Sequence, residues 1–220
     1  MKIVIGQPKL EDGLLQLEKE LMDNDADILL FPEGYLNQNV DQARELAARY
    51  GTMIVSGHRR LNERPKDRSI VIDPKGKIVL EKAKYTPAEA VEEQGWRIST
   101  LLCDELVLQG FENEEIGKVD ILMHSIGVGL FSEEQYEEWL EAARGIAVKN
   151  RCLVMGSSHG DGFYRDSEVS IPIAYCIAPD GTVLLAARND TRTRTVILNS
   201  DGGRGRIRTG TGKQADVVVE

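Results

Sequence analysis

The sequence has few of the residues that build disulfide frameworks, metal sites or aromatic surfaces. Only three residues are cysteines, only three are histidines, and aromatic residues make up 5% of the chain. The cysteines, Cys103, Cys152 and Cys176, are odd in number and include no Cys-x-x-Cys pair. The histidines also lack metal-ligand spacing. A disulfide scaffold and a zinc site are therefore disfavoured, and we expect reduced thiols with no metal or cofactor.

The sequence also lacks a long hydrophobic run and an excess of positive charge. No apolar segment approaches the roughly 20 residues that a helix needs to cross a bilayer, and the Met1-Lys2 start leads into a strand-like run instead of a signal-peptide core. The chain has 36 acidic and 27 basic side chains, a formal net charge of -9. This balance disfavours nucleic acid and anionic membranes as partners. We expect a cytoplasmic protein that acts on a small molecule.

In the first half of the chain, short apolar runs typical of strands alternate with segments whose apolar residues are three or four positions apart, as in helices. Gly51 is a candidate left-handed stop for the second helix, and Asp73-Pro74-Lys75-Gly76 is a turn sequence typical of a hairpin. The pattern predicts strands at 3–5, 28–31, 53–55, 69–72 and 77–80, and helices over about 14–21 and 40–50. Two parallel crossovers followed by a hairpin are the expected result.

The second half repeats this order. Ser132 and Gln135 form a capping box that opens a helix with an apolar face reaching Ala147, and Pro179-Asp180-Gly181 marks another hairpin. Because a helix-strand-hairpin pattern occurs once per half, we expect two mixed sheets related by an approximate twofold axis. Helices cover one face of each sheet if the other faces pack together. The predicted fold is a single α/β domain over residues 1–220, a four-layer helix-sheet-sheet-helix (αββα) sandwich.

Three reactive residues each follow an apolar, strand-like run. Glu33 follows Phe31-Pro32, Lys84 follows residues 78–80, and Cys103 follows residues 98–102. Taken singly, each has an ordinary structural reading as a solvated loop acid, a solvated lysine or a buried thiol. Together, an acid, an ammonium and a thiol at strand ends can meet at one rim of a sheet, where they provide the groups for covalent catalysis on a carbonyl carbon.

The joint pattern resembles the nitrilase or carbon–nitrogen hydrolase superfamily. Three stretches carry the resemblance: residues 26–33, ending in Phe-Pro-Glu33; residues 76–84, opened by Gly76 and ending at Lys84; and residues 96–105, which contain Cys103 and a carboxylate two places later. The order and the context of the three residues agree with that family. Weaker similarities, such as Gln7 and the Asp180-Gly181 hairpin, extend over most of the chain.

The resemblance implies a thiol amidohydrolase without a cofactor. Glu33 would act as general base for the Cys103 thiol, which attacks an amide or nitrile carbon. Lys84 and the backbone N–H of Asp104 would stabilise the oxyanion. The product would be ammonia or an amine, released by way of a Cys103 thioester, and amides are favoured over nitriles. The family also implies a homodimer or a higher homo-oligomer.

Other residues near the three motifs either support the resemblance or depart from it. Glu89 matches the place of a second glutamate that supports the lysine in the resembled family, although it also belongs to an acidic surface run. Glu105 suits a structural ion pair or a contact at a helix start, and the histidines His58, His124 and His159 are expected to be spectators. Asp104 departs from the usual aromatic residue after the cysteine, and Val107-Leu108-Gln109 replaces the usual Pro-Glu. A carboxylate at 104 would raise the Cys103 pKa and slow attack.

The C-terminal segment is basic, in contrast to the acidic body. Residues 199–220 are expected to form a Gly/Arg-rich loop, containing Arg204, Arg206, Arg208 and Lys213, followed by a terminal strand at 217–219. An arm that crosses a dimer interface, or one that binds phosphate or RNA, is an alternative. For the whole chain the alternatives are a catalytically weak relative that serves as a binding or assembly module, and a thiol redox sensor.

Overall fold

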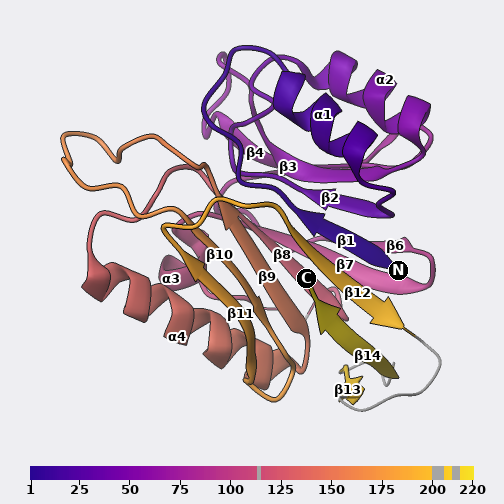
Figure 1. Ribbon diagram of the computed structural model, residues 1–220, viewed down its shortest axis with the longest axis vertical. Helices are drawn as coiled ribbons and strands as arrows, with labels where there is room; N and C mark the ends of the chain where they lie inside the picture. Colours follow the sequence, from indigo (N-terminus) through magenta and orange to yellow (C-terminus); the bar gives the residue numbers. More distant parts are fainter. Residues whose placement is uncertain (113–114, 200–205, 210–213) are drawn as a thin grey trace.

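The computed structural model describes residues 1–112, 115–199, 206–209 and 214–220. Within these ranges the chain forms an eight-stranded and a six-stranded sheet, flanked by helices (Figure 1). The helices are α1 (Leu15–Asp23), α2 (Val40–Tyr50), α3 (Glu105–Leu108) and α4 (Glu133–Asn150). None of the helices in this described part is long and apolar enough to cross a membrane.

The strands of the two sheets follow a common order. The first sheet, in spatial order, is β13 (Arg206–Arg208), β14 (Gln214–Val219), β12 (Arg194–Asn199), β1 (Lys2–Ile5), β2 (Ile28–Leu30), β3 (Met53–Arg59), β4 (Asp67–Ile72) and β5 (Ile78–Ala83). The second is β11 (Val183–Arg188), β10 (Ile173–Ile177), β9 (Leu153–Ser158), β8 (Ile121–Ile126), β7 (Trp96–Leu102) and β6 (Ala90–Glu93). The runs β1 to β5 and β7 to β11 are each laid down in sequence order, as the predicted twofold relation requires.

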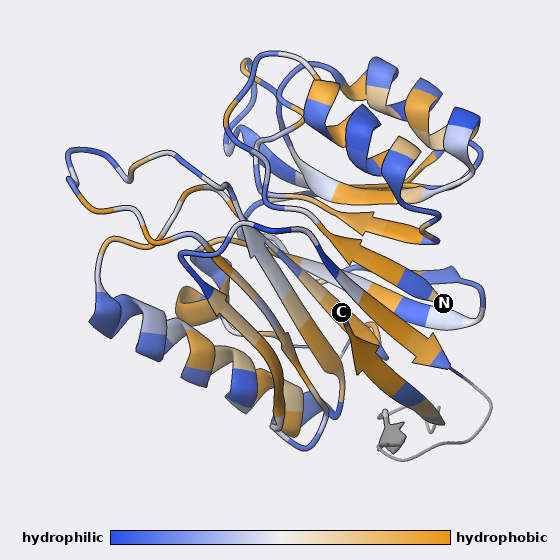
Figure 2. Ribbon diagram, in the orientation of Figure 1, coloured by the Kyte–Doolittle hydropathy of each residue, from blue (hydrophilic) through white to orange (hydrophobic). Residues whose placement is uncertain are grey.

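The sheets and helices stack in four layers. One buried cluster, which includes Ile5, Val55, Ile98 and Met155, joins strands of both sheets. A second buried cluster packs α4 against the six-stranded sheet. A third buried cluster packs α1 and α2 against the eight-stranded sheet. Figure 2 shows the strands mostly in the hydrophobic colour and the helices with mixed faces. The predicted αββα sandwich of mixed sheets is confirmed, since β1, β2 and β3 are parallel and β3, β4 and β5 antiparallel.

Local sequence signals set the ends of several elements. Gly51 ends α2 in the left-handed region at φ 65°, as its lack of a Cβ allows. The Ser132 side chain accepts a hydrogen bond from the backbone N–H of Gln135 and so caps α4. In the β4–β5 turn, Asp73 accepts bonds from the N–H groups of Lys75 and Lys77. The predicted end of α2 at Gly51, the predicted start of α4 at Ser132 and the first predicted hairpin are therefore confirmed.

The C-terminal region adds strands to the first sheet. β12 pairs antiparallel with β1, and β14 pairs with β12 through Val217–Val219, so the predicted terminal strand is present. Arg206 and Arg208 are not part of a loop, as the composition suggested, because they lie in β13, which pairs antiparallel with β14. Arg204 and Lys213 lie outside the described residues.

Candidate active site

Cys103 occupies a turn between β7 and α3. Its backbone N–H donates to the Ser125 carbonyl at 2.8 Å, which extends the parallel pairing of β7 with β8 by one residue. Its φ of 45° is in the left-handed region, which a non-glycine residue seldom adopts. Such backbone strain costs about 1–3 kcal/mol and persists where the surroundings hold it in place, often at functional sites. The turn carries the thiol out of the sheet at the carboxyl end of β7.

Glu33 lies at the corresponding end of β2, and neighbouring glycines leave room for it. Its side chain is buried. A Cβ on Gly57 would lie 2.8 Å from the Glu33 Cα, and a Cβ on Gly127 would lie 2.9 Å from Oε2. The close approach of the two backbones therefore requires glycine at 57, and a side chain at 127 would displace the Glu33 carboxylate. The carboxylate lines the same cavity as the Cys103 thiol, and its charge raises the pKa of that thiol.

Lys84 follows β5 and brings its ammonium to the same place. Its backbone N–H donates to the Asp67 carbonyl at 2.9 Å, which continues the pairing of β4 with β5. The Nζ atom lies 3.0 Å from Oε1 of Glu33 and 2.9 Å from Oδ1 of Asp104. The structure thus brings Glu33, Lys84 and Cys103 together, with Asp104 as a second carboxylate on the lysine.

The protonation states follow from burial and mutual charge. Burial raises the pKa of the Cys103 thiol to about 12, and the Glu33 carboxylate adds to this effect. Burial also raises the pKa of Glu33, although the Lys84 ammonium opposes it. For Lys84, burial would lower the pKa, but the Glu33 charge and the hydrogen bonds to Asp104 and Glu33 outweigh burial and raise it. The resting site therefore holds a neutral thiol, a charged ammonium and a carboxylate more basic than one in water.

Asp104 modifies the site in a way that the sequence indicated only in part. Burial would raise its pKa, but hydrogen bonds from Lys84 and from the Tyr85 hydroxyl lower it, so the group is ionised. Its charge does raise the pKa of Cys103, but as a smaller cause than burial or Glu33. The Asp104 backbone N–H interacts with the carboxylate of its own residue. An oxyanion would have to compete with that carboxylate for this N–H.

The supporting role expected for Glu89 is corrected by the structure. Its side chain is exposed, and its backbone carbonyl accepts a bond from the Ser99 hydroxyl at 2.6 Å, which fixes it to the β6–β7 hairpin. Glu89 does not line the cavity next to Cys103. The carboxylate that supports Lys84 besides Glu33 is Asp104.

Glu105 ties together the segments that carry Lys84 and Cys103. Its fully buried carboxylate accepts bonds from the backbone N–H groups of Leu102 and Tyr85, both at 2.6 Å, and from the Lys82 ammonium at 2.7 Å. Leu102 directly precedes Cys103, and Tyr85 directly follows Lys84. The predicted structural ion pair is therefore confirmed. Glu105 holds the segment that ends at Lys84 against the segment that ends at Cys103.

The reactive groups line a cavity of about 350 Å³. Glu33, Lys84, Cys103 and Asp104 line it together with the polar side chains of Arg59, Asp67 and Gln135. The apolar lining residues are Ile126, Val128, Leu130, Phe131, Trp139 and Tyr164. A cavity of this size fits a small molecule with a polar head and a short apolar body.

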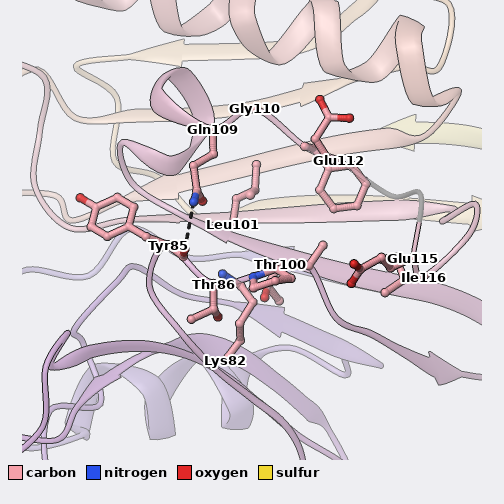
Figure 3. A pocket seen from close by; sticks show the side chains of 13 residues that line it. Lys82, Tyr85, Thr86, Thr100, Leu101, Gln109, Gly110, Glu112, Glu115 and Ile116 are labelled. Carbon is pink, nitrogen blue, oxygen red and sulfur yellow. Dashed lines mark hydrogen bonds between the residues drawn. The ribbon is translucent and has the colours of Figure 1, made fainter.

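A second cavity of about 360 Å³ lies behind the segment that follows Lys84 (Figure 3). Gln109 closes one side of it by donating to the Tyr85 carbonyl at 3.0 Å, drawn as a dashed line in Figure 3. This cavity shares no lining residue with the first. It includes none of Glu33, Lys84 and Cys103, so it is not the place where they meet a substrate.

The remaining cysteines and histidines differ in their surroundings. Cys152 and Cys176 are fully buried free thiols in the hydrophobic clusters, as expected for structural residues. His58 pairs with Glu81 at 2.9 Å. His124 and His159 are not remote spectators, because a ring nitrogen of each contacts the backbone carbonyl of Cys103 and Glu33, respectively. The sequence held no signal for these contacts, since they join residues more than 20 positions apart.

Comparison with known proteins gives a clear result for the fold. No family model and no curated protein matches this sequence. Among solved structures, an amidase from Nesterenkonia sp. AN1 matches with a TM-score of 0.73 and 12% identity over 89% of this chain and 91% of that one. A CN-hydrolase superfamily protein from Xanthomonas campestris matches with a TM-score of 0.72 and 18% identity over 89% of each chain. The resemblance to the nitrilase superfamily is confirmed at the level of the fold.

Proposed function

We propose that this protein hydrolyses a non-peptide carbon–nitrogen bond in a small carboxamide or carbamoyl compound. The observation that carries the proposal is the distance of 3.0 Å between the Lys84 ammonium and the Glu33 carboxylate, two charges that both act on the pKa of the Cys103 thiol. All three groups line one cavity of small-molecule size. An acid–base group, a cation and a nucleophile so placed are the requirements for acyl transfer to a thiol.

In the first half-reaction Glu33 accepts the thiol proton as Sγ of Cys103 attacks the carbonyl carbon. The raised pKa of Glu33 suits this role because a more basic carboxylate takes the proton more readily. The Lys84 ammonium then faces the oxyanion, a contact of a kind often worth about 3 kcal/mol. As the carbon–nitrogen bond breaks, Glu33 gives the proton to the leaving ammonia or amine, and a thioester remains on Cys103.

In the second half-reaction a water molecule replaces the amine. Glu33, again ionised, takes a proton from the water while its oxygen attacks the thioester carbon. The tetrahedral intermediate collapses, the thiolate leaves and takes up the proton, and the carboxylic or carbamic acid is released. Two further N–H groups support the intermediates in this proposal, those of Asp104 and Gly127, and the Gly127 N–H lowers the pKa of Cys103.

The similar structures support a cysteine-based amidase in particular. One mutant of the Nesterenkonia amidase holds the acetamide moiety of fluoroacetamide covalently at its active-site cysteine, and another binds butyramide. The apolar lining of the present cavity suits small aliphatic amides of that kind. The test is ammonia release from a panel of small amides, with loss expected in Cys103→Ala. A panel that yields no ammonia from the wild-type protein would reject the proposal.

A second candidate is a catalytically weak relative that serves as a binding or assembly module. It is favoured by the second carboxylate on Lys84 and by the high pKa of the buried thiol. This candidate predicts that Cys103 resists iodoacetamide at neutral pH even in the presence of small amides. Measurable alkylation of Cys103 together with amide turnover would exclude it.

A further inference from the structure

His124 is enclosed between the catalytic turn and the core of the second sheet. It lies in β8 and is fully buried. Its Nε2 atom is 2.8 Å from the carbonyl oxygen of Cys103, and its Nδ1 atom is hydrogen-bonded to the hydroxyl of Tyr175 in β10. The imidazole therefore joins the backbone of the nucleophile to a tyrosine two strands away.

The donor and acceptor roles of the Tyr175 hydroxyl and the two His124 ring nitrogens follow from the Cys103 carbonyl at the end of the chain of hydrogen bonds. A carbonyl oxygen can only accept, so Nε2 of His124 must carry the hydrogen and donate it to Cys103. In a neutral ring Nδ1 is then a lone pair and can only accept, so the Tyr175 O–H donates to it. Burial lowers the pKa of His124 to about 4, and the charges that act on it are those of Lys84 and Asp104. The neutral ring is thus the form present near pH 7.

The row of residues that holds Tyr175 in place is visible in the strand register. Tyr175 pairs with Gly156 of β9, and Gly156 pairs with His124 of β8. The three strands lie side by side in Figure 1. A Cβ on Gly156 would lie 2.4 Å from the Cε1 and Cζ atoms of the Tyr175 ring. Because Gly156 has no side chain, the ring can lie across β9 and bring its hydroxyl to His124.

Both backbone groups of Cys103 are consequently held by β8. The N–H donates to the carbonyl of Ser125, and the carbonyl accepts from His124. These two bonds act on the residue whose φ is 45°. A left-handed conformation at a non-glycine residue needs such support, because the residue would otherwise relax toward a lower-energy region.

We propose that His124 and Tyr175 are a positioning pair for the nucleophile, in which the Tyr175 hydroxyl holds the His124 ring in the orientation that supports the Cys103 carbonyl. This inference rests on the proposed function. If the Tyr175 hydroxyl is lost, Nδ1 of the buried ring has no partner, the ring can tilt, and the hydrogen bond from Nε2–H to the Cys103 carbonyl weakens. The turn relaxes, and the sulfur moves relative to Glu33 and Lys84.

Tyr175→Phe is the main test because it removes one hydroxyl and keeps the ring. The expected result is a fall in kcat for a small amide of about tenfold or more, with KM changed by less than about twofold, since small misplacements of reacting groups affect the chemical step most. Thr52→Val is the matched control. It removes another buried hydroxyl, which donates to the Ala26 carbonyl at 2.9 Å at the opposite end of the first sheet.

His124 variants separate positioning from packing. His124→Gln keeps an N–H donor near the Nε2 position and should retain more of the wild-type kcat than His124→Leu, which has no donor. Equal losses in the two variants, or an equal loss of kcat in Thr52→Val and Tyr175→Phe, would overturn the proposal. Thermal unfolding of each variant identifies any loss that comes from unfolding at the assay temperature.

Two readouts remain valid even if no amide is hydrolysed. In ¹⁵N-histidine NMR spectra, His124 should show the Nε2–H tautomer in the wild type, and in Tyr175→Phe the Nδ1 resonance should move because this nitrogen loses its hydrogen bond. Alkylation of Cys103 by iodoacetamide, measured at high pH, should be at least about threefold faster in Tyr175→Phe because the freed turn exposes the thiol. An Nδ1–H tautomer in the wild type, or unchanged alkylation, would contradict the positioning pair. Absence of amide turnover alone would reject only the proposed function.

Discussion

The ammonium of Lys84 lies as close to Asp104 as to Glu33, at 2.9 and 3.0 Å. The carboxylates of Asp104 and Glu33 therefore share the Lys84 ammonium beside the Cys103 thiol. The excess negative charge disfavours the Cys103 thiolate, and the Asp104 carboxylate competes with a substrate oxyanion for the lysine. Asp104 is thus expected to set the rate of the chemistry at this site more than any residue outside Glu33, Lys84 and Cys103.

Asp104→Asn is expected to lower the pKa of Cys103, since the Asp104 charge raises it in the wild type. The rate of Cys103 alkylation by iodoacetamide should rise, by about threefold at neutral pH for half a pKa unit, and its pH midpoint should move to lower pH. Asp41→Asn is a suitable control, because Asp41 is also ion-paired, with Arg44 at 3.0 Å, but lies on α2. A midpoint that stays the same or rises in Asp104→Asn would contradict this account.

The acid side of the pH profile should report Glu33. Glu33 must be ionised to accept a proton, and burial raises its pKa, so activity disappears as pH falls through that raised value. We expect kcat/KM for a small amide to fall at a higher pH than the ordinary value of a solvent-exposed glutamate. Lys84 stays charged over the same range because its own pKa is raised. An acid limb at or below the ordinary glutamate value would show that another group controls it.

Gly127→Ala tests the room provided for Glu33. The new Cβ would lie 2.9 Å from Oε2, so the carboxylate must move away from Cys103. We expect kcat to fall by about tenfold to a hundredfold, as for other small misplacements of catalytic groups. Gly145→Ala in α4 is the matched control, because a Cβ there meets nothing within 4 Å. That substitution should leave kcat unchanged and stabilise the protein by about 0.5–1 kcal/mol; similar activity in both variants would refute the argument.

Glu105→Gln tests the buried ion pair behind the site. It leaves the Lys82 ammonium without its counter-charge in a buried position, so the free energy of unfolding should fall by about 3–5 kcal/mol. The exposed pair of Glu112 and Lys149 provides the comparison, with an effect of Glu112→Gln below about 1 kcal/mol. Urea denaturation measures both. Equal effects of the two substitutions would mean that the Lys82–Glu105 pair is not structurally important.

Much of the fold was predictable because its signals are local. Periodicity, the Ser132 cap and the turns at Gly76 and Gly181 each act within a few residues, and the repeated order of elements implies the two-sheet arrangement. The strand-end positions of Glu33 and Cys103 were predictable because each follows a hydrophobic run. The prediction that they meet at one rim of a single sheet was wrong, because β2 and β7 belong to different sheets and the residues meet where the two sheets pack together.

What the sequence did not predict depends on contacts between distant residues. The identity of the second carboxylate on Lys84 depended on how the chain turns after β5, so Asp104 and not Glu89 occupies that place. The contact of His124 with Cys103 depends on the register of β8, β9 and β10, and on a glycine at 156 that makes room for a ring from another strand. Such details follow from packing, which no periodicity encodes.

The most direct test of the central claim is the intact mass of the protein after mixing with fluoroacetamide, followed by peptide mapping. The account predicts one added acetamide group, joined to Cys103 as a thioether as fluoride leaves, reduced in Lys84→Met and absent from Cys103→Ala. An unmodified protein, or a modification at Cys152 or Cys176 in place of Cys103, would contradict it.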